Sequence, residues 1–184
     1  MRDVTDLKRE EEEQFEQGHR IRRQQAAIVK LATSDFASRG DFKSAMRIVT
    51  EVAAEALETE RVSVWLLSDD RTELRCVDLF ERTPSAHSEN MVMHARRFPR
   101  YFKALKNGRA IDANDARKDT RTSEFLEDYL CPLGITSMLD AAIRVAGEVV
   151  GVVCQEHVGT QRTWTPDEIT FAGEIADQVV QVII

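Results

Sequence analysis

The sequence predicts an α+β fold: a central antiparallel sheet with N- and C-terminal helices packed on one face and short helices and loops on the other. Two hairpin patterns, at residues 61–80 and 134–158, predict the sheet, and helix-forming segments precede the first and follow the second. Strands joined by tight turns pair antiparallel, and amphipathic helices need an apolar surface to cover. The 184 residues are enough for one such domain and an appendage.

The composition is that of a globular chain, with 42% hydrophobic and 31% charged residues. A net charge of -7 argues against a general nucleic-acid binder, which needs a surplus of Lys and Arg on one face. No apolar run is long enough to span a bilayer, and the N-terminus is too polar for a signal peptide, so we expect no membrane contact and a cytoplasmic location. One basic cluster is either a solvated helix face or the rim of a pocket for an anionic ligand: Arg96, Arg97, Arg100, Lys103 and Lys106.

Residues 4–34 are rich in Glu, Gln, Arg and Lys and contain no Pro, which predicts one long helix. Its apolar positions are sparse, and they make at best a weak coiled-coil stripe: Val4, Leu7, Ile21 and Ile28. We therefore divide the chain into a helical linker, residues 1–36, with a possible coiled coil, and a globular domain, residues 37–184.

The first half of that domain should begin with an amphipathic helix over residues 42–57, capped by Asp41. Alternating residues then predict a strand over 61–67, a turn at 68–71 and a second strand over 72–80. Between residues 81 and 134 the pattern predicts four short elements: a strand within 87–95, a helix over 99–108, a strand and turn over 109–115, and a helix over 122–130.

The second half is more sharply patterned. Residues 134–158 form two strand-like runs that meet at a turn over 146–148, and their near-continuous apolar character predicts a sheet covered on both faces. A final helix follows, with Thr165 as its N-cap, Pro166 at the first helical position and Glu168 completing a capping box.

Three cysteines, Cys76, Cys131 and Cys154, are an odd number without CxxC spacing or a neighbouring His at metal-ligand spacing, so we expect no metal site. Cys76 and Cys154 lie in strand-like runs, where a buried thiol packs as a small apolar side chain.

The segment 134–179 resembles the C-terminal half of GAF domains: a strand that opens near a Ser, a Gly turn, a Gly-Val strand, an aromatic residue, an Asp-Glu pair and a last helix. With the hairpin from residue 60, the resemblance covers residues 38–184. It implies a GAF/PAS-like fold and a non-catalytic sensor domain of a signalling protein such as a histidine kinase or a cyclic-dinucleotide enzyme.

The ligand signatures of this family match the chain only in part, so any cofactor stays unidentified. Cyclic-nucleotide-binding members carry an Asn-Lys pair, but here Asp115 follows Asn114, although Asp167 and Glu168 do follow Trp164. Bilin-binding members attach the chromophore to a Cys that is usually followed by His, but Cys131 is followed by Pro132.

Two further branches of the family need particular residues, haem sensors a histidine and free methionine sulfoxide reductases a set of cysteines. A haem sensor needs an inward-facing His, for which His94 and His157 are the positional candidates. A free methionine sulfoxide reductase needs exposed cysteines within reach of each other, and no such cluster occurs.

A small-molecule pocket, if present, should lie between the sheet and the middle segment. Alternation puts Met138 and Asp140 on one face of their strand, and on the next strand it separates Cys154 and Glu156 from Gln155 and His157. The sequence leaves open which face meets the pocket, and core packing or a solvated edge explains each candidate equally well. The candidates are Trp65, Phe80, His94, Tyr101, Asp112, Tyr129, Asp140 and His157.

Three functional readings follow. The first is a regulatory sensor whose terminal helices act on an effector outside this chain. The second is a dimerisation scaffold that binds no ligand, and the third is a thiol enzyme. We expect a parallel homodimer through residues 1–34 and 166–184, because a helix with so thin an apolar stripe needs a partner.

Overall fold

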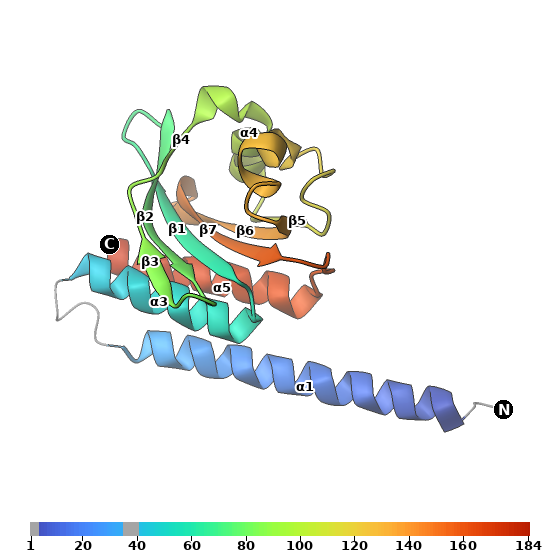
Figure 1. Cartoon of the computed structure of the whole chain (residues 1–184). Helices are drawn as coiled ribbons and strands as arrows, with labels where there is room; N and C mark the ends of the chain where they lie inside the picture. The colour runs from blue at the N-terminus through green and yellow to red at the C-terminus, as the bar shows by residue number, and fades with distance from the viewer. Residues whose placement is uncertain (1–3, 35–40) are drawn as a thin grey trace.

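The computed structural model describes residues 4–34 and 41–184 of the chain. Within them, seven strands form one antiparallel sheet that lies between two layers of helical segments (Figure 1). The predicted α+β fold is therefore confirmed. The predicted boundary between residues 36 and 37 lies outside the described residues.

The sheet has the strand order β3-β2-β1-β7-β6-β5, and β4 also pairs with β2. Its long central strands are β1 (Arg61–Leu67), β2 (Glu73–Glu81), β6 (Ile135–Val145) and β7 (Glu148–Val158). The short strands are β3 (Ala86–Ser88), β4 (Val92–His94) and β5 (Ala110–Ala113). The pairing of β1 with β7 joins the two predicted hairpins into one sheet.

The terminal helices stack on one face of the sheet in two steps. Helices α3 (Phe42–Leu57) and α5 (Pro166–Ile183) cover the strands, and α1 (Val4–Ala32) packs on the outside of both (Figure 1). The side chain of Asp41 accepts the amide hydrogen of Ser44 at 3.2 Å and caps α3, as predicted. The predicted capping box of α5 is also present, since the Glu168 carboxylate accepts the Thr165 amide hydrogen at 3.0 Å.

The β6–β7 turn and the strand after it depend on glycine. Ala146 and Gly147 both have positive φ, 50° and 85°, which is the conformation of a two-residue hairpin turn. At Gly151 a Cβ atom would lie 2.3 Å from the backbone oxygen of Trp65, so only glycine lets β7 approach β1 this closely.

The opposite face of the sheet carries the middle segment, with α4 (Pro99–Asn107) as its longest element. The remaining turns are η1 (Ala95–Arg97), η2 (Ser123–Phe125) and η3 (Leu126–Leu130). The predicted single strand within 87–95 is instead β3 and β4, because the chain turns at Asn90, which has a φ of 71°. The predicted helix over 122–130 is a 3-10 turn followed by a π turn, an arrangement that buries both Phe125 and Leu130.

The core has two halves separated by the sheet. Val64, Leu139 and Val153 face α3 and α5, whereas Trp65, Met138 and Cys154 face α4. Strands β6 and β7 are buried on both faces, which confirms the expectation from their apolar runs. No helix in the described part of the chain is long and apolar enough to cross a membrane.

Candidate functional site

A buried carboxyl group lies in the centre of the sheet face that α4 covers. Asp140 of β6 is fully buried, and the Tyr101 hydroxyl of α4 donates to its Oδ2 at 2.6 Å. Cys154 lies opposite Asp140 on β7, with its sulfur 3.7 Å from the Tyr101 hydroxyl. Burial raises the pKa of Asp140 to about 8, so the group is largely protonated at neutral pH.

A buried ion pair lies on the same face, near the C-terminal end of β7. The Arg61 guanidinium donates to Glu156 at 2.9 Å, and the Tyr129 hydroxyl donates to the other oxygen of Glu156 at 2.8 Å. Arg61 also pairs with Glu81 at the edge of the cluster. Burial alone would lower the pKa of Arg61, but Glu156 and Tyr129 raise it above its ordinary value. Burial raises the pKa of Glu156, and the charge of Arg61 opposes that shift. Both buried groups are satisfied by hydrogen bonds, as such groups must be.

Side chains fill the space between these two groups. The cavity beneath α4 has a volume of about 10 Å³, and its lining includes Trp65, Tyr101, Phe125, Tyr129 and Met138. Small-molecule pockets typically measure roughly 300–1,000 Å³. The space between Asp140 and the Arg61–Glu156 pair is therefore too small for a cyclic nucleotide, a haem or a bilin.

The structure brings together four of the eight predicted site residues: Trp65, Tyr101, Tyr129 and Asp140. Phe80 packs in the half of the core that faces α3 and α5. His157 also lies on that side, where burial and the charge of Arg162 lower its pKa. These two residues were chosen for their chemistry, and strand alternation puts them on the other face.

The remaining two predicted residues lie at the periphery. The His94 side chain is 42% exposed and lies 3.2 Å from Glu73, and the Asp112 side chain, 46% exposed, accepts from Arg121 at 3.2 Å. Neither side chain belongs to the cluster beneath α4.

Three further residues belong to the site and are not among the predicted ones: Arg61, Cys154 and Glu156. Their signal was present, because Glu156 is a charged residue inside an apolar strand and alternation puts Cys154 on the same face. An arginine at the start of the neighbouring strand was the missing partner.

The thiols differ sharply in environment. Burial raises the pKa of Cys76 to about 12 and holds that of Cys154 well above its ordinary value, whereas Cys131 is exposed. Both strand cysteines are buried, as expected, and Cys154 lies beside the polar groups of Tyr101 and Asp140. In the described residues no cluster of three or more His, Cys, Asp or Glu side chains is placed to hold a metal ion.

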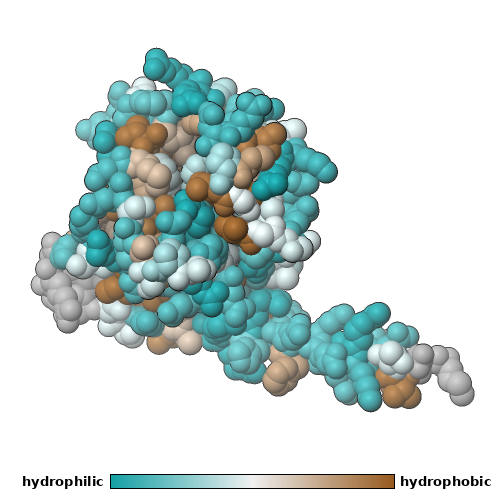
Figure 2. All heavy atoms as spheres, in the orientation of Figure 1, coloured by the Kyte–Doolittle hydropathy of each residue, from teal (hydrophilic) through white to brown (hydrophobic). Residues whose placement is uncertain are grey.

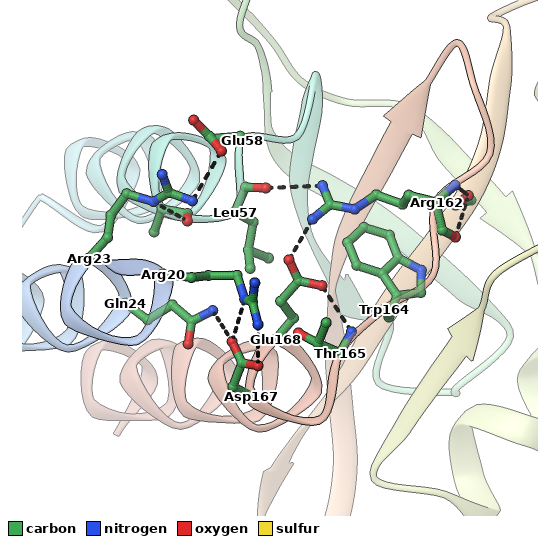
Figure 3. A network of polar contacts seen from close by, with 12 residues as sticks. Arg20, Arg23, Gln24, Leu57, Glu58, Arg162, Trp164, Thr165, Asp167 and Glu168 are labelled. Atoms are coloured by element: carbon green, nitrogen blue, oxygen red, sulfur yellow. Dashed lines mark hydrogen bonds and ion pairs between the residues drawn. The ribbon is translucent and has the colours of Figure 1, made fainter. Parts of the chain in front are cut away.

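A second polar network joins the terminal helices on the other side of the sheet (Figure 3). Arg20 of α1 donates to both oxygens of Asp167 at 2.8 and 3.0 Å, and Gln24 donates to the same carboxylate at 3.0 Å. Asp167 lies in the first turn of α5, and its hydrogen bond from Arg20 lowers its pKa to about 2. This carboxylate therefore fixes α1 to the beginning of α5.

The network continues into α3. Arg23 of α1 donates to the backbone oxygen of Ala56 at 2.9 Å, and Arg162 donates to that of Leu57 at 3.0 Å (Figure 3). Arg162 also pairs with Glu168 and lies over the Trp164 ring, 4.4 Å from its centroid. The end of α3, the start of α5 and the second half of α1 thus share one set of contacts.

The chain is similar in fold to several solved GAF domains. A phycoerythrobilin-bound GAF domain from a cyanobacterial phytochrome aligns over 87% of this chain and 94% of its own, with 17% identity and a TM-score of 0.71. The GAF domain of an Acinetobacter phosphoenolpyruvate-protein phosphotransferase aligns over 90% and 92%, with 12% identity and a TM-score of 0.67. Residues 122 to 287 of a methyl-accepting chemotaxis protein align over 85% and 94%, with 19% identity and a TM-score of 0.64.

No curated protein matches the chain at a significant level. The structural likenesses, all below 20% identity, show the fold alone. The sequence model of the GAF domain matches residues 41–183, which is most of the chain and includes the whole sheet. The chain therefore belongs to the GAF domain family.

Proposed function

We propose that this chain is a non-catalytic sensor domain that controls an effector, of kinase or cyclase type, outside the chain. The observation that carries the proposal is the attachment of α1. Its second half is bound to α3 and α5 through Arg20, Arg23 and Gln24, whereas residues 4–17 are exposed along their whole length. A helix that is anchored to a domain at one end and projects from it at the other can transmit a change in the domain to a neighbouring part of a protein.

The proposal includes a parallel homodimer through α1 and α5. The projecting half of α1 exposes Val4, Leu7 and Phe15, and Ile183 and Ile184 are exposed at the end of α5 and just after it. In Figure 2 the projecting part of α1 is mostly hydrophilic, with isolated hydrophobic groups. An unsupported helix of this kind is marginal in water, and a second copy would cover those groups.

Native mass spectrometry at micromolar concentration tests the dimer. We expect a dimer for the natural sequence and a monomer for the variant Leu7→Glu/Phe15→Glu. Thr5→Glu/Gln17→Glu, which makes the same charge change at exposed positions of the same helix half outside the apolar stripe, should remain dimeric. A natural chain that is monomeric would refute this part of the proposal.

A thermal-shift screen tests the sensor function, with cyclic nucleotides, tetrapyrroles, amino acids and small organic acids as probes. A ligand that binds only the folded state raises the melting temperature in proportion to the logarithm of its concentration. A saturable shift supports a sensor and identifies the class of its ligand.

One observation favours the alternative, a dimerisation scaffold that binds no small molecule. The cavity of about 10 Å³ beneath α4, next to Tyr101 and Glu156, leaves no room for a ligand at the centre of the sheet face. A dimer that shows no thermal shift with any probe would support the scaffold.

The thiol-enzyme hypothesis has less support. Methionine sulfoxide reduction needs a thiolate, and burial keeps Cys76 and Cys154 protonated, so only Cys131 is placed to react. If alkylation of Cys131 abolished a reductase activity, the sensor proposal would have to be revised.

The acidic, polar chain suits a cytoplasmic location, which we include in the proposal.

A further inference from the structure

A groove lies open to solvent beside the C-terminal half of α4, away from the filled cavity beneath that helix. It has a volume of about 360 Å³, which is within the lower part of the range of small-molecule pockets. Its walls are apolar: Leu67 from β1, Ala95 from η1, Phe102 and Leu105 from α4, and Val149 from β7. We call this the α4 groove.

Three cationic side chains complete the lining of the α4 groove: Arg71, Lys103 and Lys106. Lys103 and Lys106 are one helical turn apart on α4, are exposed, and form no ion pair with any residue in the described ranges. Arg71 pairs with Glu148 at 2.9 Å, but both side chains are more than half exposed, so this pair contributes little and can be exchanged for another anion.

The wall formed by α4 is held in place at its end. Arg144 of β6 donates to the backbone oxygens of Leu105, Lys106 and Gly108 at 3.2, 3.0 and 2.8 Å. These contacts satisfy the last carbonyls of the helix and fix Leu105 and Lys106 relative to the sheet. The guanidinium also adds positive charge to this end of the domain.

This arrangement selects for one kind of ligand. The apolar walls offer no side-chain hydrogen-bond partners for the hydroxyls of a sugar or a nucleotide, and a buried polar group without a partner is costly. A long apolar body fits them, and a single anionic head can reach the cations at the rim. Of the basic cluster, Lys103 and Lys106 thus lie at the rim of a groove, whereas Arg97 pairs with Asp128 and Arg100 with Glu124.

We propose that the α4 groove binds a free medium-chain fatty-acid anion, with its chain between α4 and the ends of β1 and β7 and its carboxylate at Lys103, Lys106 and Arg71. Charge complementarity and the apolar walls carry this assignment. The α4 groove is separate from the filled cavity beside Tyr101, and the proposal does not depend on whether the domain controls an effector.

Titration calorimetry with decanoate, kept below the concentration at which it forms micelles, tests the proposal on the full chain. We expect one site per chain. Decanol, which has the same chain and a neutral head, should bind more weakly to the natural protein.

Two variants separate the contributions of head and chain. Lys103→Glu/Lys106→Glu should weaken decanoate binding by roughly tenfold or more and leave decanol binding unchanged. Ala95→Phe, at a half-buried position in the wall, should fill the groove and abolish the binding of both. Lys8→Glu/Lys30→Glu, the same charge change at exposed positions of α1, should bind decanoate as the natural protein does.

Circular dichroism of each variant shows whether the fold is kept, and the unchanged affinity for decanol provides a second check on the lysine variant. Equal decanoate affinity in all variants, or none in the natural protein, would overturn the proposal. So would flotation with anionic phospholipid vesicles in the absence of decanoate binding, because the ligand would then be a membrane surface.

Discussion

The carboxylate of Asp167, at the start of α5, receives two hydrogen bonds from the guanidinium of Arg20 on α1, at 2.8 and 3.0 Å. These bonds, together with that from Gln24, join two segments that are far apart in the sequence. The geometry is the two-pronged contact that arginine and a carboxylate form best. It makes the attachment of α1 open to direct test.

Replacing Asp167 with Asn should loosen α1 without unfolding the sheet. The change removes charge-assisted hydrogen bonds at a mostly buried carboxylate, so we expect a loss of about 1–2 kcal/mol of stability. Hydrogen exchange should become faster in residues 18–32 and remain unchanged in β6 and β7. Asp177→Asn, which removes the exposed pair with Arg109, is the control and should change neither quantity.

The same carboxylate predicts a loss of stability in acid. The pKa of Asp167 is about 2 in the folded state against an ordinary 3.8, so its charged form is stabilised by folding. This contribution is complete above pH 4 and is lost as the pH falls through 3.8 toward 2. Urea midpoints of the natural protein and Asp167→Asn should therefore converge between these pH values. A difference that stayed constant would contradict the assignment.

Asp140 predicts the opposite pH dependence. Its folded pKa of about 8 lies above its ordinary 3.8, so the protonated form is favoured by folding and the group costs stability as the pH rises between the two values. Asp140→Asn removes this cost, and we expect it to gain up to about 5 kcal/mol relative to the natural protein on going from pH 4 to pH 8, because each unit of pKa difference corresponds to about 1.4 kcal/mol. Infrared spectra should show a protonated carboxyl band at neutral pH that is absent in the variant.

The buried pair of Arg61 and Glu156 should respond strongly to the loss of one partner. Arg61→Met leaves a buried carboxylate without its cation, and we expect a destabilisation of about 3–5 kcal/mol in urea unfolding. The double variant Arg61→Met/Glu156→Leu should recover most of that loss. Arg75→Met, which breaks an exposed pair with Glu73, provides a matched single change and should cost little.

The cysteines should differ in reactivity with a maleimide under native conditions. Cys131 is exposed, whereas burial keeps Cys76 and Cys154 protonated and out of contact with solvent. Peptide mapping should find one adduct, at Cys131, and three after unfolding. Rapid native labelling of Cys154 would show that α4 opens readily.

Much of the fold could be predicted because local chemistry and burial agree along the chain. Helix caps and tight turns require particular residue types, which makes them visible in a sequence. Examples are the caps at Asp41 and Thr165 and the turn at Gly147. Alternation also separated Asp140 from Leu139 correctly. It could not say which side α4 would cover, since both faces of β6 are buried.

The candidate site was predicted less well because its residues were chosen by chemical type. Phe80 and His157 have suitable side chains, but they face α3 and α5. The helix α1 shows the same limit: Val4 and Leu7 on its apolar stripe are exposed, whereas Gln24, Ala27 and Leu31 are buried against the domain. Where a helix contacts the domain through small and polar side chains, its buried face shows no hydrophobic periodicity in the sequence.

Arg144 has a mechanical consequence, because it is part of β6 and it grips the last turn of α4. The helix cannot tilt without pulling on that strand through three hydrogen bonds. Asp140 lies four residues earlier on the same strand and is bonded to Tyr101 at the beginning of the same helix. Helix α4 and strand β6 are thus attached to each other at two points, so a displacement of the helix should displace the strand at the centre of the sheet as well.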